Sequence, residues 1–244
     1  MAGPALRIAA PTREPRRGGL SDVAEFIQDD TIGNAESVVF QSEGCAFPQL
    51  EANRCFVDVV PDKQYGGIEI LNAIGQPFTI YAGVRCFAGP EPDHRERAER
   101  ALAGGRDRVL EDRLALWANG GTALAAGGDV VGAIALIEQE LDSKYLGRGI
   151  LLMSRADAIR ADASGALTAE DDGSIHTVVG TRVLASGSVT PGTIFGLGAI
   201  SVHHSRTVVT DVIAPRKNLH DALAEAIFAP AVDCEFRVKS STGA

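Results

Sequence analysis

The fold is indicated most clearly by residues 54–120, which begin RCFVDVVP (54–61), return as PFTIYAGV (77–84) and end LALWANG (114–120). Valine, isoleucine and aromatic residues crowd the first two runs, which is typical of β-strands. The segment 61–76 between them is polar and rich in glycine, and it predicts an exposed loop. A long charged run follows and predicts a surface helix. The order is therefore strand, projecting loop, strand and long helix.

The chain has 244 residues, 45% of them hydrophobic, and a formal net charge of −9. That length suits one large domain or two small ones with a substantial core. No apolar run approaches the ~20 residues of a membrane span, and no apolar leader follows the N-terminal arginines. We therefore expect neither a membrane segment nor a secretory signal. The acidic balance disfavours a general nucleic-acid binder.

Charge is unevenly distributed, because residues 1–19 carry a net charge of +3 and the rest of the chain −12. The charged residues of this segment are Arg7, Arg13, Arg16 and Arg17, against a single Glu14. Prolines and glycines are frequent in it, so it has no core of its own. One interpretation is a solvated leader. The other, which we favour, is an arm whose arginines face acidic side chains of a neighbouring molecule.

Four cysteines occur, at positions 45, 55, 86 and 234. No pair has the C-x-x-C spacing and no histidine lies at ligand spacing from them, so a zinc–cysteine site is not indicated. Cys55, Cys86 and Cys234 fall in apolar, strand-like runs. We expect buried, reduced thiols that act as small hydrophobic groups, and a cytosolic chain.

A long amphipathic helix is predicted from Pro92 or Asp93, which suit a first helical turn, to Asn119-Gly120-Gly121. Its apolar stripe has three- and four-residue steps and consists of Ala98, Leu102, Val109, Leu110, Leu114 and Trp117. The opposite face is charged and consists of Arg95, Glu96, Glu99, Arg100, Arg106, Asp107 and Glu111. Gly104 and Gly105 predict a bend, or a close crossing by another backbone.

The remaining elements are read from local periodicity. Helices are expected over 20–27, with Ser21 as the N-cap, and over 129–143 and 156–162. Strands are expected over 37–41, 149–153, 175–179, 182–185, 195–202, 207–213 and 234–239. Residues 219–227 have helical spacing, with Pro230 as the helix end.

Catalytic and ligand-binding motifs are missing from the sequence. Gly196-Leu197-Gly198 lacks the third glycine of a dinucleotide fingerprint and lies in a strand pattern. His203 and His204 are adjacent on a predicted strand, so they point to opposite faces. No nucleophile elbow or zinc-protease motif occurs. We expect no enzyme activity, no cofactor and no catalytic, cofactor-binding or metal-binding residue.

The order of these elements over residues 20–240 resembles the α+β fold of tailed-bacteriophage major capsid proteins, the Hong Kong 97-type fold, which encapsulins share. The resemblance implies an N-terminal arm (1–36), an E-loop (61–77), an A domain (123–205) and a P domain in three pieces. Those pieces are residues 37–60, residues 78–122 with the spine helix, and residues 206–244. It also implies a strand at 219–228. We follow the resemblance there, because strand pairing often overrides local propensity.

The resemblance places function at subunit interfaces. It implies that a short E-loop lies across an adjacent subunit, through Lys63, Gln64, Tyr65, Ile68 and Ile70. Some relatives crosslink a loop lysine to an asparagine, but no acid is placed to catalyse such a bond at Lys63, so crosslinking is not expected.

The resemblance further implies partners and a location. Copies of the chain would form hexamers and pentamers that close into an icosahedral shell around double-stranded DNA, without sequence-specific contact. Scaffold, portal or decoration proteins are further candidate partners, and no membrane is involved. The location would be the virion, after assembly in the bacterial host cytoplasm.

Two alternatives remain. An encapsulin-type compartment for protein cargo has the same fold, but usually begins with an amphipathic helix that lines the cargo site. Here the corresponding region is a proline-rich arm, which favours a phage capsid. The other alternative is an acidic enzyme domain with a site that the motifs do not reveal.

Overall fold

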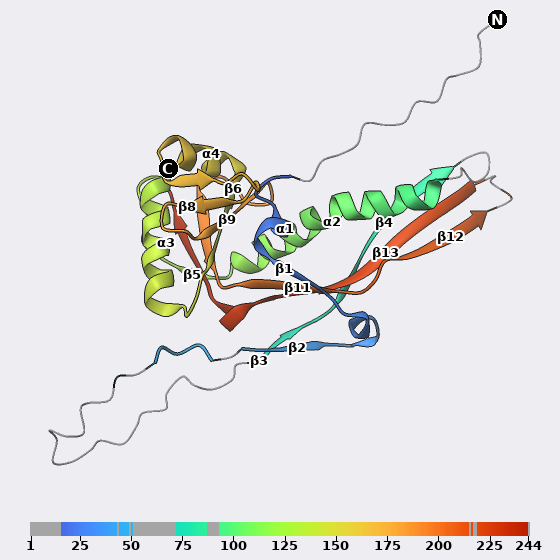
Figure 1. Cartoon of the computed structure of the whole chain (residues 1–244), viewed down its shortest axis with the longest axis horizontal. Helices are drawn as coiled ribbons and strands as arrows, with labels where there is room; N and C mark the ends of the chain where they lie inside the picture. The colour runs from blue at the N-terminus through green and yellow to red at the C-terminus, as the bar shows by residue number, and fades with distance from the viewer. Residues whose placement is uncertain are drawn as a thin grey trace, which may run out of the picture.

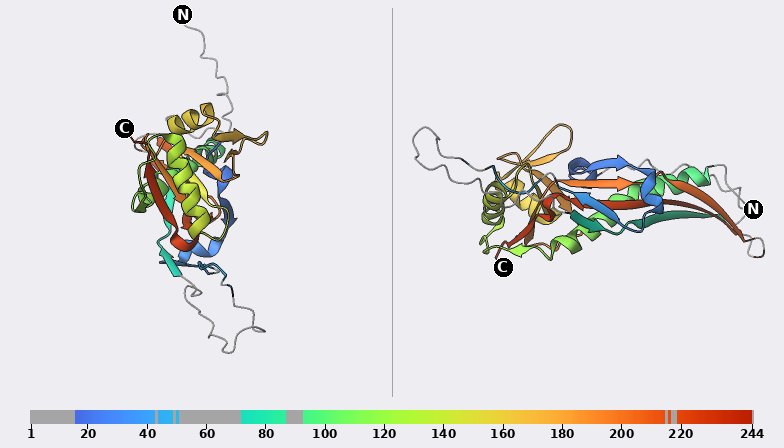
Figure 2. Two further views of the ribbon diagram at one scale, coloured as in Figure 1. Left: turned by 90° about the vertical axis from the view of Figure 1, so that its left-hand side faces the viewer. Right: turned by 90° about the horizontal axis from the view of Figure 1, so that it is seen from below.

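Two main β-sheets and a long helix that spans both make up the body of the molecule (Figure 1). The computed structural model describes residues 16–42, 44–48, 50, 72–86, 93–214, 216 and 219–243. Within them the fold is α+β, which confirms the prediction. The outline is elongated (Figure 2). None of the described helices is long and apolar enough to cross a membrane.

The five-stranded sheet is built around the long strand β13 (Leu219–Val232). One edge of β13 pairs with β4 (Phe78–Cys86). The other edge pairs with β12 (Val208–Ala214) and then β11 (Ile200–His204). The strand expected from the resemblance is thus confirmed, and the helical spacing of 219–227 was misleading.

Alternation in β13 explains that outcome. Ala222, Ala224 and Ala226 are buried on the face that α2 covers, while the intervening residues are half-exposed on the other face. Small side chains at every second position let a helix lie close to the sheet. The spacing of the alanines therefore suits a strand beneath a helix.

The long helix α2 (His94–Ala118) follows Asp93, as predicted, and is unbroken. Leu102, Leu110 and Leu114 are buried as expected. Val109 is 40% exposed, so its assignment to the stripe is wrong. Trp117 is half-buried, with the Arg237 guanidinium 4.4 Å from its ring centroid.

Two further expectations for α2 are corrected. A Cβ at Gly104 or Gly105 would meet no atom within 4 Å, so in the described part of the chain no backbone crosses the helix closely there. Glu111, expected on the exposed face, is 0% exposed. Three- and four-residue steps from Leu114 and Ala118 place Glu111 on the stripe, next to Leu110.

The N-terminal segment also differs from its prediction. The expected helix over 20–27 is a single turn, α1 (Leu20–Val23), which begins after Gly19, not Ser21. It is followed by β1 (Glu25–Gln28), which pairs in parallel with β11, and by the 3₁₀ helix η1 (Asp30–Asn34). Pairing of Phe26 with Val202 overrides the helical spacing.

The seven-stranded sheet has the order β5-β14-β10-β6-β9-β8-β7. Its strands are β5 (Thr122–Ala123), β6 (Ile150–Ser154), β7 (Leu167–Ala169), β8 (Ile175–Thr177), β9 (Arg182–Ser186), β10 (Thr193–Leu197) and β14 (Arg237–Ser241). Helices α3 (Val130–Lys144) and α4 (Arg155–Ala163) pack against it, close to their predicted positions.

The two sheets meet where two connections cross between them. The expected strand 195–202 is interrupted at Gly198, which separates β10 from β11, and a Cβ there would lie 2.4 Å from the Asp233 carbonyl oxygen. The 3₁₀ turn η4 (Asp233–Glu235) similarly separates β13 from β14. The predicted boundary at residue 205 placed β11 with the A domain and β14 with the P domain. Instead, β11 belongs to the five-stranded sheet and β14 to the seven-stranded sheet.

Candidate assembly surfaces

A buried carboxylate holds the start of the described chain. Glu111 Oε1 accepts hydrogen bonds from Arg16 Nη2 (2.9 Å) and the Leu20 backbone N–H (3.2 Å), and Oε2 accepts one from the Ser186 hydroxyl (2.6 Å). A buried charge is tolerated only when it is paired and hydrogen-bonded. Glu111 therefore fixes Arg16 and the start of α1 against the long helix.

Residues next to Arg16 are also tied to their own chain. The Gly18 carbonyl accepts a hydrogen bond from the Ala185 N–H at 2.9 Å, and Arg155 donates to the Arg17 carbonyl at 3.3 Å. Gly18 has φ +65°, and a Cβ there would lie 2.7 Å from Ile175 Cδ1, so glycine is required.

This geometry corrects part of the arm prediction. Arg16 pairs with Glu111 of the same chain, because that buried carboxylate needs a cation, and the Arg17 side chain lies against Gly173. Arg7 and Arg13 lie outside the described residues, so their contact with a neighbour stays a prediction.

A two-stranded ribbon forms the base of the predicted E-loop. It pairs β2 (Val38–Gln41) with β3 (Asn72–Gly75) as a small sheet of its own, below the main sheets in Figure 1, and the Phe40 ring lies 5.7 Å from the His203 ring of β11. Val39 and Ile74 are direct cross-strand partners and are 53% and 74% exposed. The ribbon thus presents an apolar pair to solvent.

The ribbon changes the predicted loop limits. Residues 72–75 were expected in the loop, but they form a strand whose partner is β2. The proposed contact residues Lys63, Gln64, Tyr65, Ile68 and Ile70 lie outside the described residues, as does the expected strand at 54–60. Their roles stay predictions.

The five-stranded sheet has an open face on the side away from α2. Tyr81 of β4 and Val208 of β12 both lie opposite Glu225 of β13, and Val212 lies opposite Asp221. These three apolar residues, which we call the open-face cluster, are 52–69% exposed. Asp221 forms a two-bond ion pair with Arg85 on the same face, both bonds at 2.8 Å.

A third apolar surface lies between β8 and β9. Val178 and Val179 are consecutive and are 68% and 71% exposed. Single exposed apolar residues are ordinary, but clusters on a soluble chain mark surfaces that a partner covers. The ribbon pair, the open-face cluster and this valine pair come from separate parts of the fold.

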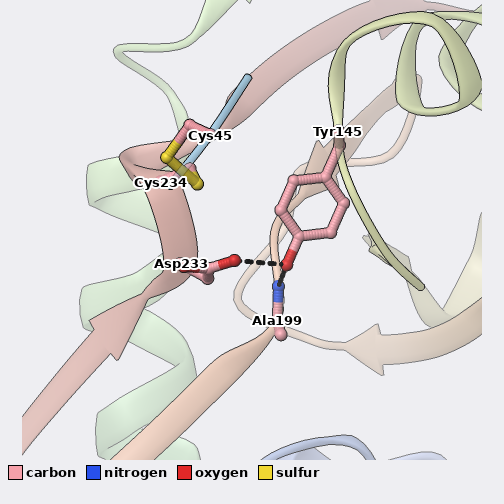
Figure 3. Close-up of a disulfide and its surroundings, with 5 residues drawn as sticks. All are labelled: Cys45, Tyr145, Ala199, Asp233 and Cys234. Atoms are coloured by element: carbon pink, nitrogen blue, oxygen red, sulfur yellow. Dashed lines mark hydrogen bonds between the residues drawn. A yellow bond between two sulfur atoms is a disulfide. The ribbon is translucent and has the colours of Figure 1, made fainter. Parts of the chain in front are cut away.

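A disulfide joins Cys45 to Cys234 at the crossing between the sheets, with an S–S distance of 2.00 Å (Figure 3). The prediction of a reduced, buried Cys234 is wrong. The partners are 189 residues apart, so no spacing pattern reveals them. Cys86 is a buried free thiol, as predicted, and Cys55 lies outside the described residues. The cytosolic expectation loses its basis in cysteine usage.

The Tyr145 side chain bonds to both connections that cross between the sheets (Figure 3). Its hydroxyl donates to Asp233 Oδ2 and accepts from the Ala199 N–H, both at 2.9 Å. Burial and the neighbouring Asp233 carboxylate raise the pKa of Tyr145 to about 12, although the hydrogen bond from Ala199 opposes the shift. One neutral phenol thus links both crossing connections to the end of α3.

Solved structures of phage capsids share this fold. Mycobacterium phage Che8 matches with a TM-score of 0.57 and 16% identity, over 98% of this chain and 97% of the other. The capsid of the native GTA particle matches with a TM-score of 0.60 and 11% identity, over 100% and 96% of the two chains. The capsid of Ralstonia phage GP4 matches at 0.55 and 10% identity, over 98% and 95%.

Sequence comparison adds no relative, since no family model and no curated protein matches. The structural matches nevertheless cover nearly all of each chain. This chain therefore has the fold of tailed-phage major capsid proteins.

Proposed function

We propose that this chain is the major capsid protein of a tailed phage. Its copies assemble through hexamers and pentamers into an icosahedral shell that encloses double-stranded DNA, and the protein acts as a building unit rather than as an enzyme. Subunits are made in the bacterial host cytoplasm and end in the virion. Scaffold, portal and decoration proteins are further candidate partners.

The observation that carries the proposal is the exposed Val39–Ile74 pair, which lies on the side of the ribbon away from the Phe40–His203 contact with the five-stranded sheet. An apolar pair that its own chain leaves exposed gains stability when another surface covers it. In a shell, each subunit can offer the ribbon to a neighbour and receive another ribbon in return. Many modest contacts of this kind then sum in a closed particle.

The net charge of −9 supports a container for DNA rather than a DNA-binding protein. An acidic wall repels phosphates and leaves packed DNA free of strong, local contacts. This charge agrees with enclosure that does not depend on base sequence.

Mass photometry and negative-stain electron microscopy of the purified full-length chain test the proposal. We expect particles in the megadalton range, or capsomers of five and six subunits. A monomer or small oligomer under every assembly condition, including added crowding agent, contradicts it.

A second experiment tests the E-loop. Replacing residues 62–71 by a short Gly-Ser turn leaves the ribbon strands β2 and β3 in place. We expect a folded, soluble subunit that does not close shells. Closed particles from this variant at the wild-type yield contradict the proposed role of the loop.

The encapsulin-type compartment is the alternative. In the described chain the first helix is α1, with four residues, where an encapsulin usually has a longer cargo-lining helix. The structural matches named above include the capsid of Ralstonia phage GP4 and the capsid of the native GTA particle. Nucleic acid in particles from infected or induced cells favours the capsid, and one reproducibly enclosed protein favours the compartment.

A further inference from the structure

Two histidines and an aspartate from distant parts of the chain meet at one end of the five-stranded sheet. His94 is the first residue of α2, Asp211 lies in β12, and His220 lies near the start of β13. Figure 1 shows the start of α2 beside this end of β12 and β13. No local spacing connects the three residues, so the sequence alone does not reveal them.

Both imidazoles direct the same nitrogen at one carboxylate oxygen. Nε2 of His94 lies 3.0 Å from Asp211 Oδ1, and Nε2 of His220 lies 3.4 Å from it. The ring centroids are 4.5 Å apart in an edge-to-face arrangement. One possible ligand atom from each residue lies within 4.8 Å of the others.

His220 supplies the independent sign that a ligand belongs here. Its side chain is only 9% exposed, and its Nε2 is buried without a hydrogen-bond partner among the described residues, although it faces Asp211. A buried polar atom left unsatisfied destabilises the folded state. An ion between the three groups would satisfy that nitrogen.

We propose that His94, Asp211 and His220 bind a divalent transition metal of the zinc class. Zinc holds imidazole nitrogen and carboxylate oxygen at about 2.0–2.2 Å in a tetrahedron, so its ligand atoms lie about 3.3 Å from one another. The two nitrogen–oxygen distances, 3.0 and 3.4 Å, fall around that value. Two imidazoles also favour zinc-class ions over magnesium and calcium, which prefer oxygen ligands.

Arg95 and the solvent beside Asp211 complete the proposed metal site. Arg95 donates to Oδ2 of Asp211 at 2.5 Å, which orients the carboxylate and leaves Oδ1 as the single ligand atom. The Asp211 side chain is 29% exposed, whereas both histidines are buried. Water could therefore reach a bound metal from the side of Asp211 and serve as its fourth ligand.

The metal would join three segments that are far apart in the chain. It would hold the start of the spine helix to β12 and β13 and so stiffen this end of the sheet. Because the site lies within one chain, the inference does not depend on the proposed shell function.

Metal titration of the full-length protein, after chelation and dialysis, tests the site. We expect one Co²⁺ per chain with the visible absorption of tetrahedral cobalt, displacement by Zn²⁺ but not by excess Mg²⁺, and a higher melting temperature with Zn²⁺. His220→Gln and Asp211→Asn should each weaken binding by at least ~10-fold. His176→Gln, which removes a histidine of the other sheet, should bind as the wild type does.

Folding of each variant is checked by circular dichroism and by its metal-free melting temperature, because a change at buried His220 can loosen the sheet. Asp211 is partly exposed, so Asp211→Asn gives a second, milder variant. The proposal is overturned if the wild type takes up no Co²⁺ or Zn²⁺ in a saturable way. Unchanged binding in a folded Asp211→Asn or His220→Gln variant overturns it equally.

Discussion

The two main sheets differ in how far their faces are buried, although one helix spans both. The central strands β6, β9 and β10 of the seven-stranded sheet are buried on both faces. In the five-stranded sheet, β13 alternates buried and half-exposed residues, and β12 is largely exposed. The first sheet is closed between layers, and the second keeps one face open.

Two neighbouring residues of β6 show how the seven-stranded sheet is covered on both faces. Leu151 packs with Ile137 of α3 on one face, and Leu152 packs with the cluster that contains Leu110 of α2 on the other. A sheet covered on both faces stabilises its own chain. A sheet with an uncovered apolar face, like the one that carries Tyr81, has surface left for another molecule.

The largest effect is expected inside the closed sheet. Leu151→Ala and Leu152→Ala should each lower the free energy of unfolding by about 2–5 kcal/mol, because each removes a fully buried side chain. Chemical denaturation measures the loss. If one of the two costs less than about 1 kcal/mol, β6 is not covered on both faces and the comparison fails.

The next effect concerns the link that Glu111 makes between the helix and the closed sheet. Glu111→Ala removes the charged hydrogen bonds to Arg16 and Ser186 and should cost about 1.5–3 kcal/mol. Limited proteolysis should also cut near Arg16 faster. The matched control is Asp112→Ala, whose exposed pair with Arg108 contributes only about 0.3–0.5 kcal/mol. Equal losses in the two variants would contradict the anchoring role.

A third prediction concerns the hydrogen bonds that Tyr145 makes where the two sheets meet. Tyr145→Phe removes hydrogen bonds to Asp233 and Ala199 and should cost about 1–2 kcal/mol. The pKa of Tyr145 is raised from 10.0 to about 12, so its contribution is complete below pH 10. It is lost as the pH rises from 10 to 12, because the unfolded chain ionises first.

The free energy of unfolding, measured between neutral and strongly alkaline pH, checks the direction of this pH dependence. The difference in stability between wild type and Tyr145→Phe should be constant below pH 10 and shrink above it. A difference that grows with pH would show that the folded protein ionises first, contrary to the buried, hydrogen-bonded phenol.

Sequence patterns recovered the elements whose periodicity is local. The helices at 130–144 and 155–163 and the strands β4, β6 and β9 follow from spacing and composition alone. Strand β13 did not, because its apolar residues also recur at the three- and four-residue steps of a helix, as Leu219, Ala222, Leu223, Ala226 and Ile227 do. Only the resemblance to a whole fold placed it correctly. Gly198 was missed as a strand break because its role depends on the distant Asp233 backbone.

The interaction residues were harder to predict, since they depend on contacts distant in sequence. Arg16 could not be assigned to its own chain without knowing that Glu111 is buried, yet a signal existed: Glu111 shares the helical register of Leu114 and Ala118. The disulfide between Cys45 and Cys234 and the His94–Asp211–His220 group had no such signal.

The smallest effect on stability is expected on the open face, where the comparison is sharpest. Tyr81→Ser and Val212→Ser change side chains that are 69% and 54% exposed, so each should alter the free energy of unfolding by no more than about 0.5 kcal/mol. If a neighbouring subunit covers this face, the same changes remove apolar contact from every copy, and the losses add over the particle. The double variant should therefore melt like the wild type but yield fewer closed particles in mass photometry.

The control is Thr79→Ala, which changes a side chain on the same face of β4 that carries no large apolar group. Wild-type assembly by the double variant would show that the open face is solvated in the particle, and would shift attention to the ribbon and the Val178–Val179 pair as contact surfaces.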